Sequence, residues 1–308
     1  MIVHRGYENL DLVDPVVTLG VFDGVHRGHR ALLDMLVKRA KDKGGEPAVI
    51  SFHPHPRHFL GINEPELSLL TTMDEKQELL KSAGIRHLII LDFNKDFSNT
   101  GACDFVKNVL IGKVKTKHLI IGYDHRFGRS AEGDFNTIKQ CRDLSNFTVE
   151  QAEGVFKGIE AISSSAIREA LVNGRLDEAN NMLGYNYSLS GIVVDGRKIG
   201  RAFGFPTANI ETEKYKLVPA NGVYAVEVLV NSLKYRGMLS IGFNPTIIPA
   251  RNERSIEVHI IDFDGDIYGR NISVKFRYRL RDEKKFEDTA RLAAQMELDK
   301  VETIRLLT

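Results

Sequence analysis

Two histidines, His26 and His29, are the residues of this sequence best placed to do chemistry. They stand in the segment 22–29, FDGVHRGH, which follows an apolar run over 16–21 that predicts a buried strand. Beyond them the apolar spacing becomes helical. A helix that starts at a glycine turn after a strand binds anions, because its first N–H groups are unpaired and carry partial positive charge. Two imidazole donors there would stabilise the extra charge of a pentacovalent phosphorus, so the segment predicts phosphoryl or nucleotidyl transfer.

The glycines of this loop, Gly24 and Gly28, would let the backbone approach an anion closely. The loop is not a Walker A sequence, because no G-K-[ST] follows, and it is not G-x-G-x-x-G. One alternative is a plain strand–helix turn with two surface histidines. A zinc site is a second alternative, but it would need a third ligand, and none lies nearby in the sequence.

The bulk composition bounds the class of protein. The chain has 308 residues, enough for two domains with full cores. Its 42 basic and 41 acidic residues give a net charge of +1, which favours neither a nucleic-acid partner nor an anionic membrane. The sequence contains two cysteines, Cys103 and Cys141, which are far too few for a framework of several disulfides. Neither a signal peptide nor an apolar stretch near the ~18 residues of a membrane span is seen, so we expect a soluble cytoplasmic protein.

The first half alternates short apolar strands with helices, which predicts βα units and a parallel sheet. Ligands of such sheets bind beyond the carboxyl ends of the strands. Further strands are predicted within 48–52, 86–93, 117–122 and 147–151. A capping box over 72–75 predicts a helix that ends at Gly84, and further helices are predicted over 101–110 and 134–142. The loops expected at the ligand edge are 22–28, 53–60, 93–100 and 122–133, the last too long for a mere connector.

Three histidines, His53, His55 and His58, lie close together in SFHPHPRHF and suggest a metal site. Pro54 and Pro56 instead enforce an extended loop, and no carboxylate or cysteine is interleaved. We therefore predict a loop at the edge of the sheet rather than a metal centre.

A serine cluster opens the segment 161–171, AISSSAIREAL, which predicts a helix with Ser164 or Ser165 as its N-cap. Arg168 lies one turn further on the same side. Hydroxyls, helix N-terminal amides and a guanidinium together suit a triphosphate. Taken alone, the segment could equally be a capped helix with a surface arginine.

At this point a family resemblance becomes specific. GVFDGVHRGH and ISSSAIR resemble the nucleotidyltransferase superfamily that transfers AMP from ATP to a phosphate-bearing acceptor. FDGVHRGH, SFHPHPR and GYDHRFGRSAEGD are similar to the adenylyltransferase module of bacterial bifunctional riboflavin kinase/FAD synthetases. The resemblance implies a Rossmann-like α/β fold, catalytic roles for His26 and His29, and a flavin contact at His55, Pro56 and Arg57. It implies nucleotide contacts at Gly20, Phe22, Asp23, Gly24, Gly28, Asp124, Ser163, Ser164, Ser165 and Arg168.

One departure from that family is visible at Ala161, where the family often carries a basic residue. Lys157 could take its place, and the contact stays open.

The second half changes to short alternating strands, which predicts a small antiparallel β-barrel. The change falls near Tyr187, so we predict domains over 1–185 and 186–308. Strands are expected at 189–194, 223–230, 256–261 and 272–280, with a hairpin turn at 264–265 joining the last two and a helical tail over 282–307.

The chemistry of this half centres on DGRKIGRAFGFPTANI, a glycine-rich basic loop that enters an extended segment. Thr207 and Asn209 are two residues apart, so both side-chain oxygens would point to one face. A hydroxyl and an amide carbonyl are hard ligands suited to Mg²⁺ with phosphates. The alternative is a glycine-rich hairpin with two surface polar residues.

The predicted strand IEVHIIDF places Glu257 opposite the apolar Ile256 and Val258. A carboxylate in a barrel mouth could accept the proton of a primary alcohol as that alcohol attacks phosphorus. The alternative is a solvent-facing strand glutamate.

GFPTANI, NGVY, IEVHIIDF and RDEKKF…QMELD resemble the riboflavin kinase module of the same family. The resemblance implies that riboflavin and ATP–Mg²⁺ give FMN and ADP, and that FMN and ATP then give FAD and pyrophosphate. It implies that Glu257 is the base and that Asn221, Gly222, Arg281 and Glu283 bind flavin. It also implies that Gly200, Gly204, Thr207 and Asn209 bind nucleotide, with Thr207 and Asn209 also holding the Mg²⁺. No nucleic-acid or membrane partner is implied. Two alternatives are an adenylyltransferase for another acceptor, such as a nicotinate or pantetheine phosphate, and a non-enzymatic flavin-binding regulator.

Overall fold

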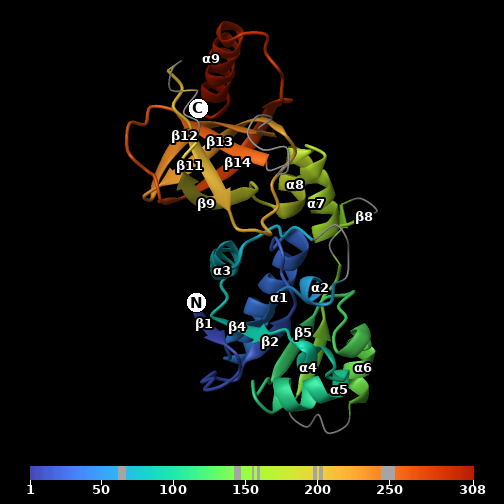
Figure 1. Cartoon of the computed structure of the whole chain (residues 1–308). Coiled ribbons are helices and arrows are strands. Elements are labelled where there is room, and N and C mark those ends of the chain that lie inside the picture. The colour runs from blue at the N-terminus through green and yellow to red at the C-terminus, as the bar shows by residue number, and fades with distance from the viewer. Residues whose placement is uncertain are drawn as a thin grey trace. The chain divides into compact units, whose positions relative to one another are not determined.

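The computed structural model describes residues 1–61, 67–141, 147–154, 156–157, 160–196, 200, 204–243 and 254–308. It divides into two compact units, Met1–Ser164 and Ser165–Thr308, and each is described by itself (Figure 1). The domain boundary predicted after residue 185 lies later in the chain than this division. Helices α7 (Ser164–Val172) and α8 (Leu176–Leu183) belong to the second unit, except for Ser164, which is the last residue of the first unit. In the described residues, no helix combines the length and apolar character needed to cross a membrane.

The first unit is built on a parallel sheet with the strand order β1-β4-β3-β2-β5-β6. Its strands are β1 (Ile2–Arg5), β2 (Val16–Leu19), β3 (Pro47–His53), β4 (His87–Asp92), β5 (His118–Ile121) and β6 (Thr148–Gln151). Each neighbouring pair is parallel, as predicted. The chain moves outward from β2 to β3 and β4, then returns to place β5 on the other side of β2. This reversal creates a switch point between β2 and β5, which is where ligands bind in such sheets.

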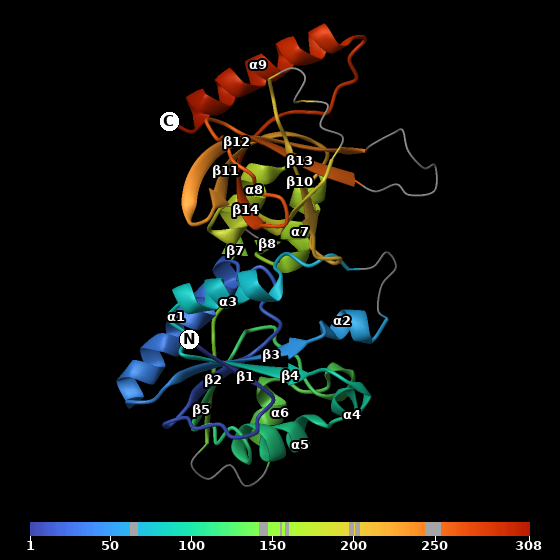
Figure 2. The ribbon, with the colours of Figure 1, turned by 60° about the vertical axis from the view of Figure 1, so that its left-hand side comes forward.

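Two apolar layers cover the two faces of this sheet, because successive strand residues point to opposite sides. On one face α1 (Arg27–Lys43) and α3 (Met73–Ser82) bury a cluster that includes Val16, Leu36 and Leu80. On the other, a second cluster includes Val17, Phe105 and Ile138. The elements of that layer are α5 (Ala102–Asp104), the π-helix η1 (Phe105–Ile111) and α6 (Phe135–Gln140) (Figure 2).

Short elements follow several strands of the first unit. They are α2 (Pro56–Phe59), α4 (Lys95–Ser98), the 3₁₀ turn η2 (Arg129–Ala131), and the two-residue strands β7 (Phe156–Lys157) and β8 (Glu160–Ala161). The loop predicted over 53–60 is thus partly helical, with His55 as N-cap and Pro56 in the first turn. Arg142, at the end of the helix predicted over 134–142, lies outside the described residues.

The second unit contains a closed barrel in the order β10-β13-β12-β11-β14-β9, in which neighbouring strands are antiparallel. The strands are β9 (Ser188–Val194), β10 (Ala208–Thr212), β11 (Gly222–Val230), β12 (Leu233–Phe243), β13 (Arg254–Ile260) and β14 (Asn271–Arg281). The predicted barrel is therefore confirmed.

The hairpin predicted at 264–265 is wrong. β13 pairs with β10 and β12, whereas β14 pairs with β9 and β11, so the two strands are not neighbours. Asp264 and Gly265 belong to a connection between strands that are separated in the barrel. The predicted strand list also lacked β12, which pairs along the full length of β11.

Three helices complete the second unit. α8 is joined to the barrel through Asn180, whose Oδ1 accepts the Tyr187 N–H at 2.7 Å and whose Nδ2 donates to the Phe276 carbonyl at 3.2 Å. α9 (Thr289–Leu306) packs on β11, β12 and β14 (Figure 2). It begins later than the predicted residue 282, because Asp288 caps it by accepting the Arg291 N–H at 2.8 Å.

Candidate active sites

The loop after β2 is held in place by a buried carboxylate. Asp23 accepts hydrogen bonds from the N–H groups of Leu70 and Thr71, each at 3.1 Å, and from the Thr71 hydroxyl at 3.3 Å. Gly24 donates its N–H to that hydroxyl at 3.2 Å and has φ +82°, a conformation that favours glycine. The carboxylate predicted to contact nucleotide therefore fixes the backbone of the loop.

His26 and His29 lie together at the start of α1. His26 is the N-cap, and its Nδ1 accepts the His29 N–H at 3.4 Å. The two rings stack with centroids 3.7 Å apart, and His29 also packs at 5.0 Å against Phe22. Burial, with help from the nearby charge of His26, lowers the pKa of His29 well below its ordinary value, so its imidazole is neutral at pH 7. A neutral ring can still donate one N–H to a phosphate oxygen.

Gly28 leaves room for this packing. A Cβ at Gly28 would come within 3.2 Å of the His26 ring and 3.6 Å of the Ile162 carbonyl oxygen. The glycine predicted for anion approach therefore also leaves room for the histidine pair.

A lysine that sequence reasoning missed lies beside the pair. Lys76, in α3, is only 6% exposed, and its charge contributes to the lowered pKa of His29. Burial lowers the pKa of Lys76, and the nearby Asp23 carboxylate opposes that change. The signal was present in the sequence, because Lys76 and Leu80 are four residues apart on the buried face of one helix.

The serine cluster meets the loop through Ser164, whose hydroxyl donates to the Asp23 carbonyl at 2.8 Å. Ser164 and Ser165 are the first residues of α7, so the prediction that one of them is the N-cap is wrong by one position and Ser163 precedes the helix. Arg168 follows one turn later in the same helix. The side chains of Lys157 and Ala161 lie outside the described part of the chain, so the basic contact stays a prediction.

A cavity of about 670 Å³ opens at the switch point between β2 and β5. Three of the four predicted ligand-edge loops, 53–60, 93–100 and 122–133, contribute to its lining, whereas the loop 22–28 does not, and aromatic rings form much of the wall. Its lining is Gly20, Val21, Phe52, Pro56, Leu60, Phe93, Phe97, Ser98, Asn99, Thr100, Phe105 and residues 125–131. The volume and the aromatic wall suit an aromatic ligand.

The predicted flavin contacts of this unit divide. Pro56 lines the cavity. His55 instead caps α2, its Nδ1 accepting the Arg57 N–H at 3.1 Å. Asp124, which was predicted to contact nucleotide, lines a smaller hollow of about 230 Å³ beside the cavity, together with Tyr123 and Gln151.

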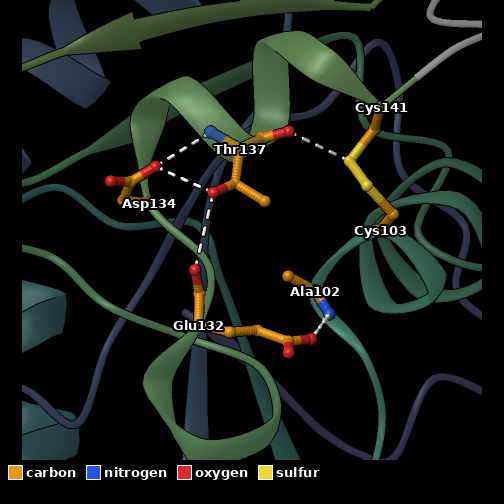
Figure 3. The surroundings of a disulfide bond; sticks show 6 residues. All are labelled: Ala102, Cys103, Glu132, Asp134, Thr137 and Cys141. Carbon is orange, nitrogen blue, oxygen red and sulfur yellow. Dashed lines mark hydrogen bonds between the residues drawn. A yellow bond between two sulfur atoms is a disulfide. The ribbon is translucent and has the colours of Figure 1, made fainter.

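One wall of the cavity is held by close backbone packing. A Cβ at Gly128 or Gly133 would clash with Ala102, and the Ala102 N–H donates to the Glu132 carboxylate at 2.9 Å (Figure 3). Beside it a disulfide joins Cys103 to Cys141, linking the end of α6 to α5 (Figure 3). The two cysteines were too few to predict a disulfide framework, and this single bridge links only α5 and the end of α6.

In the barrel, the residues predicted for kinase chemistry converge. The Thr207 hydroxyl donates to Glu257 Oε2 at 3.2 Å, and Asn209 lies opposite Glu257 in the β10–β13 register. Glu257 lies on the face of β13 opposite the buried Ile256 and Val258. It therefore faces the 205–207 segment and not the barrel interior.

The glycine loop is only partly described. Gly200 accepts the Phe205 N–H through its carbonyl at 2.9 Å, and Gly204 has φ +80°. Gly196 is packed so closely that a Cβ there would clash with the Asn209 side chain. Residues 197–199 and 201–203 of this predicted loop lie outside the described residues.

The four predicted flavin contacts of the barrel also divide. Asn221 accepts the Arg254 Nε–H at 2.8 Å and donates to Glu283 at 3.5 Å. Gly222, with φ +150°, packs against the Arg281 carbonyl oxygen, where a Cβ would clash. The guanidinium of Arg281 is instead taken by Asp299 of α9, with Nη2 2.7 Å from Oδ2 and Nε 3.0 Å from each carboxylate oxygen.

Comparison with known proteins agrees with this arrangement. A family described as FAD synthetase matches residues 9–166, and one described as riboflavin kinase matches residues 183–307. A bifunctional riboflavin kinase/FMN adenylyltransferase of Bacillus subtilis is 38% identical over 94% of this chain and 92% of its own length. The protein of the same description from Escherichia coli K12 is 35% identical over 96% and 95%.

A solved structure has the same fold throughout. A crystal structure from Streptococcus pneumoniae, titled as a macrolide-efflux protein, is 31% identical, with a TM-score of 0.88 over 98% of this chain and 99% of that one. A fold likeness does not by itself assign the transport function in that title.

Proposed function

The chain belongs to the family of bifunctional riboflavin kinases/FMN adenylyltransferases, and from that premise we propose which residues carry each reaction. Adenylyl transfer is assigned to the loop and cavity of the first unit, with the 1–185 segment as its domain. Riboflavin phosphorylation is assigned to the Thr207–Glu257 cluster, with 186–308 as its domain. The observation that carries the proposal is that the stacked histidine pair follows β2, and that Gly20 and Val21, directly after the C-terminal end of β2, line a large aromatic cavity at the switch point.

In adenylyl transfer, a phosphate oxygen of FMN attacks the α-phosphorus of ATP, the new P–O–P bond forms and pyrophosphate leaves. The FMN phosphate is already ionised at pH 7, so no strong base is needed. His26 and His29 would donate hydrogen bonds to oxygens that gain charge in the transition state. Arg168 and the serines that open α7 would hold the departing pyrophosphate at a helix N-terminus. The aromatic cavity would hold the flavin ring and orient the attacking phosphate.

In phosphorylation, the 5′-hydroxyl of riboflavin attacks the γ-phosphorus of ATP and ADP leaves. Glu257 would accept the hydroxyl proton as the new P–O bond forms. The Thr207 hydroxyl, which now donates to Glu257 at 3.2 Å, orients that carboxylate. Asn221 and Glu283 would bind the flavin, because their side chains adjoin at one end of the barrel.

The donor set in the barrel fits a magnesium ion that arrives with ATP. Thr207 and Asn209 offer a hydroxyl and an amide oxygen, and both lie next to a carboxylate. In the described residues no cluster of three or more His, Cys, Asp or Glu side chains forms a metal cage, so these two residues would bind the ion together with the phosphates. When bound, the ion would neutralise phosphate charge. Because both reactions consume ATP, we place the protein in the cytoplasm.

The proposal is tested by following purified protein with riboflavin, ATP and Mg²⁺ and measuring FMN, FAD, ADP and pyrophosphate. We expect FMN to appear first and FAD to follow, with one ADP and one pyrophosphate for each FAD. AMP transfer to a nicotinate or pantetheine phosphate without FAD would favour the alternative acceptor. Flavin binding without either product would favour a regulatory protein.

A further inference from the structure

His125 stands between the two hollows of the first unit and has no role in the reaction described so far. Its ring lines the aromatic cavity, and it also borders the smaller hollow that contains Asp124. It stacks nearly parallel on Phe127, with an interplanar angle of 16° and centroids 6.1 Å apart. His125 is also close enough to His29 for its charge to affect the pKa of that residue. The ring therefore lies where the flavin cavity meets the histidine pair.

One ring nitrogen of His125 is left without a partner. Nε2 is buried, and no group in the described part of the chain is within hydrogen-bonding distance of it. His29 Nδ1 is likewise buried and has no hydrogen-bond partner among the described residues. A buried polar atom that stays unpaired costs about 1–3 kcal/mol, so such atoms are usually satisfied by water or ligand.

We propose that His125 is a positioning residue for FMN, its Nε2–H donating a hydrogen bond to the phosphate end of that substrate. The inference rests on the proposed adenylylation site. If the flavin ring fills the aromatic cavity, the FMN phosphate must extend toward His26 and His29 to reach the α-phosphorus of ATP. His125 lies along that path, beside the rings that line the cavity and within electrostatic reach of His29.

The character of the ring suits a hydrogen-bond donor rather than a fixed charge. Burial lowers the pKa of His125 to about 4, so the imidazole is neutral at pH 7 and carries one N–H. Its stacking on Phe127 fixes the ring plane. A neutral, oriented donor can align a phosphate oxygen without holding the product tightly by charge.

The test compares His125→Phe with His125→Gln in the full-length enzyme. Phe keeps a flat ring against Phe127 but removes the donor, whereas Gln keeps an N–H donor and loses the ring. We expect His125→Phe to lower kcat/KM for FMN in adenylylation by about 10- to 100-fold, the loss of one buried hydrogen bond. The KM for ATP should stay within threefold, and His125→Gln should recover part of the loss.

The riboflavin kinase rate on the same preparation, with the melting temperature, serves as the internal control for folding. His4→Phe is the matched control, because His4 lies in β1, stacks on His87 and is not part of the cavity wall. A His125→Phe enzyme with kcat/KM for FMN within threefold of the parent would overturn the proposal, as would a defect confined to KM for ATP. Failure of the parent enzyme to adenylylate FMN would instead overturn the proposed function.

Discussion

The imidazoles of His26 and His29 stack at 3.7 Å between centroids, with only 19° between their planes. Burial, and after it the nearby charge of His26, hold the pKa of His29 well below its ordinary value, because two cations could not share this arrangement away from water. In the proposed adenylylation, the pair would therefore act through oriented N–H groups rather than through two positive charges. This distinction governs how the enzyme should respond to mutation and to pH.

His29→Ala is expected to lower FMN adenylylation by about 10²–10³-fold, the usual cost of one preorganised transition-state donor. Riboflavin phosphorylation should be unchanged, because the barrel cluster is built from Thr207, Asn209 and Glu257 in the other unit. Both rates are measured on one preparation, with His4→Ala as control. An unchanged rate of FAD formation from FMN would remove His29 from the mechanism.

Lys76→Met should move the acid limb of the adenylylation pH profile to higher pH. The positive charge of Lys76 helps to lower the pKa of His29, so its removal raises that pKa and protonates His29 earlier as pH falls. Lys81→Met is the control, because Lys81 belongs to the same helix but its side chain is 61% exposed. kcat/KM for FMN is measured from pH 5 to 8 for all three proteins, and an unmoved acid limb contradicts the prediction.

Glu257→Gln should abolish most riboflavin phosphorylation and spare adenylylation of added FMN. Gln keeps the volume but cannot usefully accept a proton, and loss of a general base costs about 10²–10⁴-fold. Glu211→Gln is the control, since Glu211 is an exposed strand glutamate on neighbouring β10. A kinase rate within threefold of the parent, less than ~1 kcal/mol in barrier, would retire Glu257 as the base. Unchanged melting temperatures are required for the comparison.

A fragment of residues 165–308 should be more stable than one of residues 186–308, although both should phosphorylate riboflavin. The shorter fragment lacks α8, whose Asn180 pairs with Tyr187 and Phe276 of the barrel. It also lacks the Leu171 carbonyl, which accepts the Ala220 N–H at 2.9 Å. Thermal melting and kinase assays of both fragments test this, and equal melting temperatures would show that the helices add nothing to the barrel.

Glu150→Gln should weaken the first unit at neutral pH by about 1–2 kcal/mol. Glu150 is bound by Arg39 through contacts of 2.7 and 2.8 Å and lies 3.1 Å from His118 Nε2. Chiefly through the Arg39 hydrogen bonds, its pKa falls from an ordinary 4.5 to about 2. A lowered carboxylate pKa stabilises the fold above about pH 4.5 and loses that effect as pH falls toward 2.

The measurement is unfolding of parent and variant between pH 7 and pH 2. The difference in unfolding free energy between parent and Glu150→Gln should shrink as the pH falls from about 4.5 to about 2. Glu78→Gln, at a side chain that is 76% exposed, should match the parent at every pH. A difference that grows on acidification would contradict the sign.

Features fixed by neighbouring residues were predicted from the sequence. The capping box of α3 is present as expected, with Thr72 and Glu75 bonded reciprocally at 3.0 and 3.2 Å, because it depends on positions three apart. Strand β12 was missed because Gly237 and Gly242 interrupt its alternation. A Cβ at either glycine would clash with a side chain from another segment, Val228 or Glu283.

Features that join distant segments could not be predicted from the sequence. The disulfide spans 38 residues, and the cavity wall is assembled from loops after four strands, so neither follows from local pattern. The turn residues at 264–265 predicted a hairpin because the local signal does not contain the strand order. The roles of Asn221, Glu283 and Arg281 came only with the resemblance, and the structure shows that Arg281 pairs with Asp299.

The two sheets differ in how they end, and this bears on self-association. The barrel closes on itself, so each of its six strands has a neighbour on both sides. The parallel sheet ends at β1 and β6, and β1 presents Ile2 and Val3 at 54% and 37% exposure. An open strand edge with apolar side chains can template pairing with another chain. Concentration-dependent aggregation of truncated or heat-stressed protein should therefore begin at β1 of the first unit, and a charged substitution at Ile2 should suppress it.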